Sequence, residues 1–162
     1  MSKKLKIYLD TSVINFLFAN DTPDLKIITK DFFENFVRLG KYQVFVSDVV
    51  IREMEMTEDA DRRAQLVSVV RDYSLRILRL NEEAERLAYT YITEKIIPPR
   101  NIEDARHIAI ASCNQMDILL SWNFKHLANI HKQLAVKIIN EREGYFYPLI
   151  LTNPMEALYE ND

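Results

Sequence analysis

Three carboxylates lie close to junctions between apolar and helix-like stretches of the sequence. Asp10 follows "KIYL", Glu53 follows "VSDVVIR", and Asp104 is near the start of "EDARHIAIAS". Carboxylates packed together at a partly buried site repel one another and raise one another's pKa unless a cation neutralises them. Hard oxygen ligands suit Mg²⁺ or Mn²⁺ rather than zinc. If the three acids converge, we therefore expect a hard divalent cation among them.

Two polar residues follow a later apolar run in the same way. Ser121 and Asn123 end "DILLSWN", just as Asp10 and Ser12 follow the first run. In open α/β sheets the functional crevice lies at the carboxyl ends of the strands, so we expect these groups to meet the acids there. A divalent cation at such a site binds phosphate oxygens and lowers the pKa of a bound water. The reaction class that this favours is phosphodiester hydrolysis.

Each acid also has a simpler explanation. An Asp at a strand-to-helix junction, such as Asp10, is a common N-cap, and Glu53 can be a partner of the helix dipole. The segment "EDAR" around Asp104 is typical of a solvated helix start. Only the combination of residues favours a cation site, and the sequence leaves both interpretations open.

The composition excludes several functional classes. The net charge of −3 argues against a surface that coats polyanions generally, so phosphate must be handled locally. With two glycines, the chain has no glycine-rich nucleotide loop. Cys113 is the only cysteine, which excludes an internal disulfide and a thiolate zinc cluster and predicts a cytoplasmic location. No apolar stretch reaches the roughly 20 residues of a spanning helix, so we expect no membrane association.

These side chains must be positioned by strands that alternate with helices. Strands are expected at 5–9, 42–47, 75–80, 117–122 and 135–139. Helices are expected at 11–18, 27–39, 49–54, 60–73, 82–96, 101–115 and 123–133. This alternation predicts an α/β fold, a three-layer α/β/α sandwich with a mainly parallel central sheet. The length suits one domain, residues 1–162.

The motifs, taken in order, resemble those of PIN-domain proteins, and within that family the chain is similar to VapC-type toxin ribonucleases. "IYLDTSVIN" resembles the first motif and "VSDVVIREM" the second. "EDARHIAIA" resembles the third and "DILLSWNFKHLAN" the fourth. The resemblance covers most of the chain, and it is the set in sequence that is specific.

The resemblance implies a compact α/β/α sandwich and an endoribonuclease that depends on Mg²⁺ or Mn²⁺. Asp10, Glu53 and Asp104 match the family's acidic metal ligands, and Thr11 and Ser12 are hydroxyls beside them. It also implies an RNA substrate, a small cognate antitoxin that inserts near the acidic pocket, and a homodimer. The expected function is therefore that of the toxin of a toxin-antitoxin pair.

The fourth motif departs from the common pattern of the family, because Asn123 stands where an acid is usual. We expect Asn123 to complete the catalytic set by orienting water or substrate, as in a subgroup with the same "WN" ending. One negative charge fewer favours a single metal. The alternative is a catalytically weak or inactive PIN-like domain that binds RNA or a protein.

Four further residues are expected at the substrate: Thr11, Ser12, Ser121 and Lys125. A cation such as Lys125 beside the acidic pocket would meet RNA phosphates, although a solvated helix face explains it more simply.

Two aromatic side chains near the motifs have alternative roles. His107 is one helical turn after Asp104, where it would either orient that carboxylate or be buried with a hydrogen bond. Trp122 would either stack on an unpaired base or, as we favour, pack beneath a helix.

Two other classes that begin with an Asp after a strand fit less well. A phosphatase of the haloacid-dehalogenase type needs a second acid two residues after its first Asp, where this chain has Ser12. A receiver domain needs an Asp after a central strand and a later strand-end Lys. Neither "LRILRL" nor "DILLSW" supplies them.

Overall fold

Five short apolar segments form one sheet in the computed structural model, which describes residues 3–158. The strands are β1 (Lys6–Leu9), β2 (Gln43–Ser47), β3 (Arg76–Leu78), β4 (Ile118–Leu120) and β5 (Ile150–Thr152). Their order across the sheet is β3-β2-β1-β4-β5, and every pair is parallel. The predicted α/β fold is confirmed, with a sheet that is parallel throughout.

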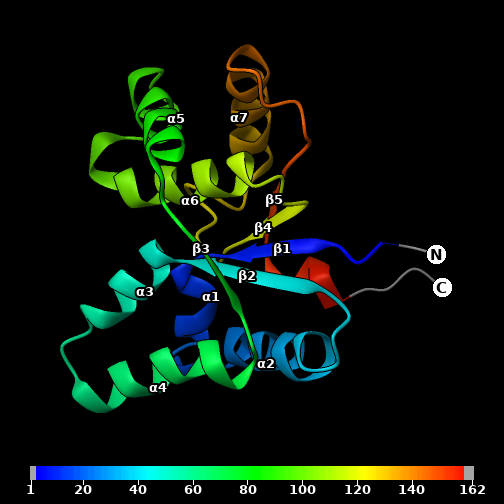
Figure 1. Cartoon of the computed structure of the whole chain (residues 1–162). Coiled ribbons are helices and arrows are strands. Elements are labelled where there is room, and N and C mark those ends of the chain that lie inside the picture. The colour runs from blue at the N-terminus through cyan, green and yellow to red at the C-terminus, as the bar shows by residue number, and fades with distance from the viewer. Residues whose placement is uncertain (1–2, 159–162) are drawn as a thin grey trace.

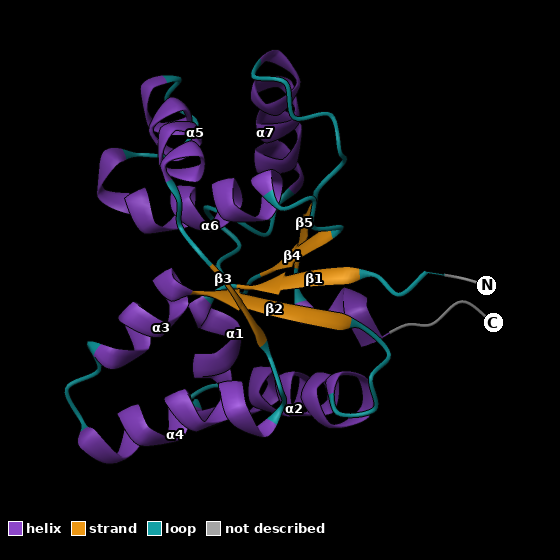
Figure 2. Ribbon diagram, in the orientation of Figure 1, coloured by secondary structure: helices purple, strands orange, loops and turns teal. Residues whose placement is uncertain are grey.

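Helices cover both faces of this sheet, as predicted (Figure 1). One face carries α1 (Thr11–Asn15), α2 (Pro23–Phe32), α3 (Asp48–Glu55) and α4 (Ala60–Asp72). The other carries α5 (Glu82–Thr93), α6 (Ile102–Cys113) and α7 (Ile130–Arg142). Shorter helical segments are 3-10 turns at Phe16–Phe18, Pro99–Asn101 and Pro154–Leu158 and a π-helical turn at Phe33–Val37 that extends α2. Figure 2 shows the resulting three layers, with the strands between the two sets of helices.

Strand β1 is the centre of the core. Ile7, Tyr8 and Leu9 are fully buried, because β1 has a strand on each side and helices above and below. Burying one such apolar side chain contributes about 1.5–3 kcal/mol. The residue that follows β1 is therefore held at a fixed point of the sheet's carboxyl edge.

The last predicted strand is wrong. Residues 135–139 belong to α7, in which Val136, Ile139 and Asn140 are buried while Ile138 is exposed. Buried residues at this spacing form one stripe of a helix rather than the alternating face of a strand. The predicted helix at 123–133 also shifts, because α7 begins only at Ile130 and the residues from Asn123 to Asn129 form turns.

None of the helices in residues 3–158 is long and apolar enough to cross a membrane.

Candidate functional site

Asp10 follows strand β1 and caps α1. Its Oδ1 accepts hydrogen bonds from the Ser12 hydroxyl at 2.6 Å and the Val13 backbone N–H at 3.3 Å, and its Oδ2 accepts one from the Ser121 hydroxyl at 2.5 Å. Only 3% of the residue is exposed. Burial raises the pKa of this carboxyl, although the charge of His107 and the two hydroxyls favour its ionised form. Asp10 is thus an N-cap and also a buried carboxylate at the sheet edge.

The two serines join the ends of strands β1 and β4. Ser12 Oγ accepts a hydrogen bond from the Trp122 backbone N–H at 2.9 Å, and Ser121 Oγ accepts one from the Asn123 backbone N–H at 2.9 Å. Both hydroxyls also donate to Asp10. The structure therefore brings the first and fourth motifs together around this carboxylate.

Asp104 lies in the first turn of α6 and meets Asn123. The side-chain amide of Asn123 donates to Asp104 Oδ2 at 3.2 Å, and that of Asn101 donates to the same atom at 3.4 Å. The Asn123 Oδ1 accepts from the His126 backbone N–H at 3.1 Å, which fixes the amide's orientation. Burial, together with the charges of Asp10 and Glu53, raises the pKa of Asp104 to about 6, against the opposing effect of His107.

Glu53 is paired with a buried histidine. Its Oε1 lies 2.8 Å from Nε2 of His107. Burial raises the pKa of this carboxyl, but the hydrogen bond and charge of His107 outweigh that effect, and the net pKa is lowered. His107 has a raised pKa, because its bond to Glu53 and the charges of Glu53, Asp10 and Asp104 outweigh the effect of its own burial. The third acid is also near enough to Asp104 for its charge to raise the pKa of that carboxyl.

The remaining predicted residues differ in their surroundings. Thr11 is buried, and its hydroxyl has no hydrogen-bond partner of ordinary geometry among the described residues, although it is near enough to Glu53 to help lower the pKa of that carboxyl. Lys125 is exposed, two residues beyond Asn123, and its ammonium makes no hydrogen bond or ion pair within residues 3–158. Trp122 is packed rather than exposed, and its Nε1–H donates to Thr29 at 2.9 Å.

The described part of the chain contains no group of three or more His, Cys, Asp or Glu side chains close enough together to hold a metal ion. The three acids thus do not form a ready-made cage. Mg²⁺, however, usually binds through one or two carboxylates and keeps several waters for substrate phosphates. Asp10 and Asp104 offer such oxygens, and the buried hydroxyl of Thr11, which follows Asp10 in the sequence, makes no hydrogen bond of ordinary geometry among the described residues. By chemical type these oxygens suit Mg²⁺ or Mn²⁺.

Sequence reasoning missed two contributors to the site, Tyr8 and Asn101. Tyr8 lies inside an apolar strand, and nothing in the sequence pattern except its hydroxyl indicates a role at the site. Asn101 precedes helix α6, and an Asn at this position commonly caps a helix with its side chain. Here its Nδ2 donates a hydrogen bond to the Asp104 carboxylate instead. Of the two roles expected for His107, the structure has burial with hydrogen bonds, which go to Glu53 and Tyr8 rather than to Asp104.

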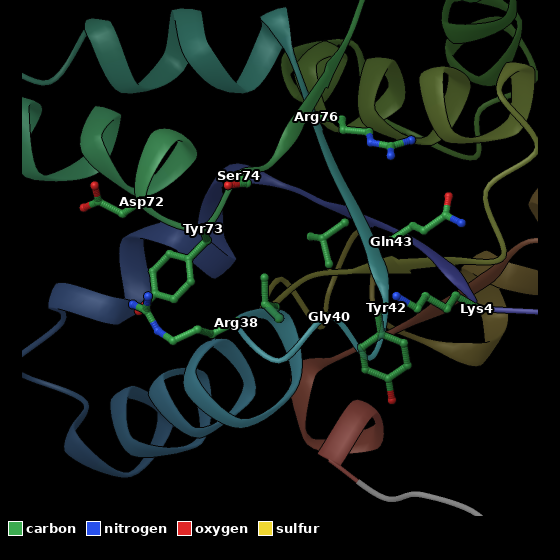
Figure 3. Close-up of a pocket in the computed structure, with 11 residues that line it drawn as sticks. Lys4, Arg38, Gly40, Tyr42, Gln43, Asp72, Tyr73, Ser74 and Arg76 are labelled. Carbon is green, nitrogen blue, oxygen red and sulfur yellow. The ribbon is translucent and has the colours of Figure 1, made fainter.

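Figure 3 shows a pocket of about 410 Å³ at the opposite, amino edge of the sheet. Gln43 and Arg76, the first residues of β2 and β3, line it together with Lys4 and Arg38. Helix α4 and the π-helical turn end here, and cations are favoured near the carbonyl ends of helices. None of the predicted site residues lines this pocket.

A comparison of the chain with protein-family models and with curated proteins found no match.

Proposed function

We propose that this protein is a PIN-like endoribonuclease that hydrolyses RNA phosphodiester bonds with one Mg²⁺ or Mn²⁺. The observation that carries the proposal is the pair of carboxylates at the sheet edge. Asp10 is buried, and Asp104 has a pKa of about 6 in part because Asp10 and Glu53 are near it. Such an arrangement costs free energy that a bound divalent cation would offset.

Asp10 and Asp104 would hold the cation, with Glu53 as a third acid beside them. When bound, the metal would polarise a phosphoryl oxygen and lower the pKa of a coordinated water. The chain's own residues supply the positioning. Ser12 and Ser121 fix both oxygens of Asp10, and the amides of Asn101 and Asn123 fix Oδ2 of Asp104. In this arrangement Asn123 supports an acid instead of being one, which favours a single metal.

A basic cluster beside the acids supports RNA as the substrate. We define it as Arg100, Lys125, His126 and Lys132. Burial, followed by the charges of Lys125, Lys132 and Arg100, lowers the pKa of His126, so these cations lie near one another. Arg100 adjoins Asn101, and Lys125 is two residues from Asn123. Positive charge at this position would hold the RNA backbone across the carboxylates.

The biological role follows from the motif resemblance alone. We propose that the protein is the toxin of a toxin-antitoxin pair, neutralised by a small cognate antitoxin, and that it forms a homodimer. We further propose a cytoplasmic location, because a chain with one cysteine has no need of an oxidising compartment.

Metal-dependent cleavage of labelled single-stranded RNA tests the activity. Purified wild-type protein should cleave with Mn²⁺ or Mg²⁺ and not with EDTA. Asp10→Asn and Asp104→Asn should each lower the rate at least about 100-fold, because each removes a negatively charged ligand. Asp61→Asn, an exposed residue of α4, is the matched control and should cleave like wild type. Cleavage that survives both site substitutions would rule out the assignment.

The alternative of a weakly active or inactive binding domain is favoured by one residue, Asn123. An amide there leaves the site without its usual fourth acid. If wild type binds RNA but does not cleave it with either metal, Asn123→Asp should be assayed next. Cleavage gained by that variant would identify the amide as the cause of inactivity.

A further inference from the structure

A chain of hydrogen bonds leads from Glu53 into the buried core. His107 Nε2 lies 2.8 Å from Glu53 Oε1, and its Nδ1 lies 2.6 Å from the Tyr8 hydroxyl. The Tyr8 hydroxyl in turn lies 2.7 Å from Oγ of Ser47. These four residues come from α3, α6, β1 and β2, so the chain ties both layers of helices to the sheet.

The direction of the bond to Glu53 is fixed by chemistry. An ionised carboxylate only accepts hydrogen bonds, so the imidazole must carry its proton on Nε2 and donate it to Glu53. The phenol of Tyr8 can either donate to Nδ1 or accept from it. It therefore satisfies the ring whether the histidine is neutral or charged.

The network closes on itself through helix α3. Ser47 Oγ accepts from the Val50 backbone N–H at 3.4 Å and so caps α3, the helix that carries Glu53. The same network therefore caps the helix that carries Glu53 and contacts the Glu53 carboxylate. Tyr8 and Ser47 are fully buried and His107 is 2% exposed, so bulk water cannot readily replace a lost partner.

We propose that His107 is a positioning residue, which Tyr8 and Ser47 hold so that its Nε2–H fixes the Glu53 carboxylate toward the metal. The inference rests on the proposed function, in which Glu53 faces the cation. Groups that orient metal ligands through hydrogen bonds typically change metal affinity or activity by about 10–100-fold when they are removed.

A pair of substitutions separates positioning from structural support. A glutamine amide nitrogen reaches about the place of Nε2, whereas an asparagine amide reaches only about the place of Nδ1. His107→Gln should therefore keep a donor for Glu53 and bind Mn²⁺ within about threefold of wild type. His107→Asn should keep only the contact with Tyr8 and bind Mn²⁺ about 10–100-fold more weakly. Mn²⁺ binding is measured by the electron paramagnetic resonance signal of the free ion.

The outcomes distinguish this inference from the proposed function. Equal loss in both variants, or no loss in His107→Asn, overturns the positioning role while the metal site stands. Lack of Mn²⁺ binding by wild type contradicts the proposed function instead.

A second measurement needs neither metal nor RNA. In ¹⁵N NMR spectra of the wild-type protein, Nε2 of His107 should carry a proton that exchanges slowly with water. The shift of the opposite nitrogen should change in Tyr8→Phe, a variant that keeps the aromatic ring in the core. An unprotonated Nε2 would overturn the inference even if the histidine variants fail to fold.

Discussion

Asp104 carries an electrostatic cost in the folded protein, because burial and the charges of Asp10 and Glu53 raise its pKa to about 6. A carboxyl whose folded pKa is about 6 and whose ordinary value is 3.8 binds a proton more tightly when folded. Proton binding by Asp104 therefore stabilises the folded protein. This stabilisation is complete below about pH 4 and is lost as the pH rises through about 6. At pH 7 and above, the metal-free protein bears the full cost.

Replacing this carboxyl by an amide should therefore stabilise the metal-free protein. Asp104→Asn keeps an oxygen for the amides of Asn101 and Asn123 and removes the charge. We expect its free energy of unfolding to exceed that of wild type by about 1–3 kcal/mol at pH 7.5 and to equal it near pH 4. Urea titrations in EDTA at the two pH values measure this difference.

Saturating Mn²⁺ provides the internal check. It should stabilise the wild-type protein by about 2.7 kcal/mol at a metal concentration 100 times the Kd, and should stabilise Asp104→Asn far less. A variant that is less stable than wild type at pH 7.5 in EDTA would contradict the raised pKa of Asp104.

Much of the site at this scale could be predicted from the sequence. Asp10 and Ser121 both follow strands, and the ends of parallel strands share one edge, so their meeting follows from topology. The partner of His107 could not be predicted in this way. Spacing along α6 places the histidine on the same face as Asp104, but its bond to Glu53 depends on how α6 approaches α3 in space.

At the scale of elements, the caps link local folding to the site. Ser47 Oγ caps α3, and Asn81 Oδ1 caps α5 by the same kind of bond, from the Ala84 backbone N–H at 2.9 Å. Only the first cap also touches the network behind Glu53.

Ser47→Ala and Asn81→Ala should therefore differ in one respect. Each should lower the free energy of unfolding by about 1–2 kcal/mol, the usual cost of a lost N-cap. Ser47→Ala alone should also weaken Mn²⁺ binding, because Tyr8 loses a partner. Chemical denaturation and Mn²⁺ titration of both variants measure the two effects, and weaker Mn²⁺ binding in Asn81→Ala as well would show that any lost cap has this result.

The elements themselves could be predicted where their pattern was long. Strands β1 and β2 and the start of helix α5 at Glu82 occur where the sequence indicates them. The segment 135–139 could not be assigned correctly, because a short run of β-branched residues fits a strand or a buried helix equally well. Strand β5, at Ile150–Thr152, was not predicted from the sequence.

At the scale of the molecule, an acidic protein must bind a polyanion through a local basic surface. The chain has a net charge of −3, yet the basic cluster of Arg100, Lys125, His126 and Lys132 adjoins the acids. The proposed RNA binding should therefore depend on a few cations at one edge of the sheet.

Salt titrations of RNA binding in EDTA test this dependence. A plot of the logarithm of the RNA association constant against the logarithm of the salt concentration has a slope of about −0.7 for each phosphate contact to a single strand. Arg100→Gln and Lys125→Gln should each reduce the slope by about that amount. Lys4→Gln and Arg76→Gln, at the pocket of the opposite edge, should leave it unchanged. An equal effect of all four would show that RNA binding is not confined to the basic cluster.

Trp122 is an intrinsic fluorescence probe close to Asp10. It is the only tryptophan in the chain, it is 5% exposed, and its backbone N–H donates to the serine that holds Asp10. Its indole packs against Phe16 and Phe124, whose ring centroids each lie 5.9 Å from its own. Light at the long-wavelength edge of protein absorbance excites tryptophan selectively, so the emission comes from Trp122 alone. A cation that displaces Asp10 should change the emission wavelength or the quantum yield of Trp122. Cation binding can then be followed without an added label.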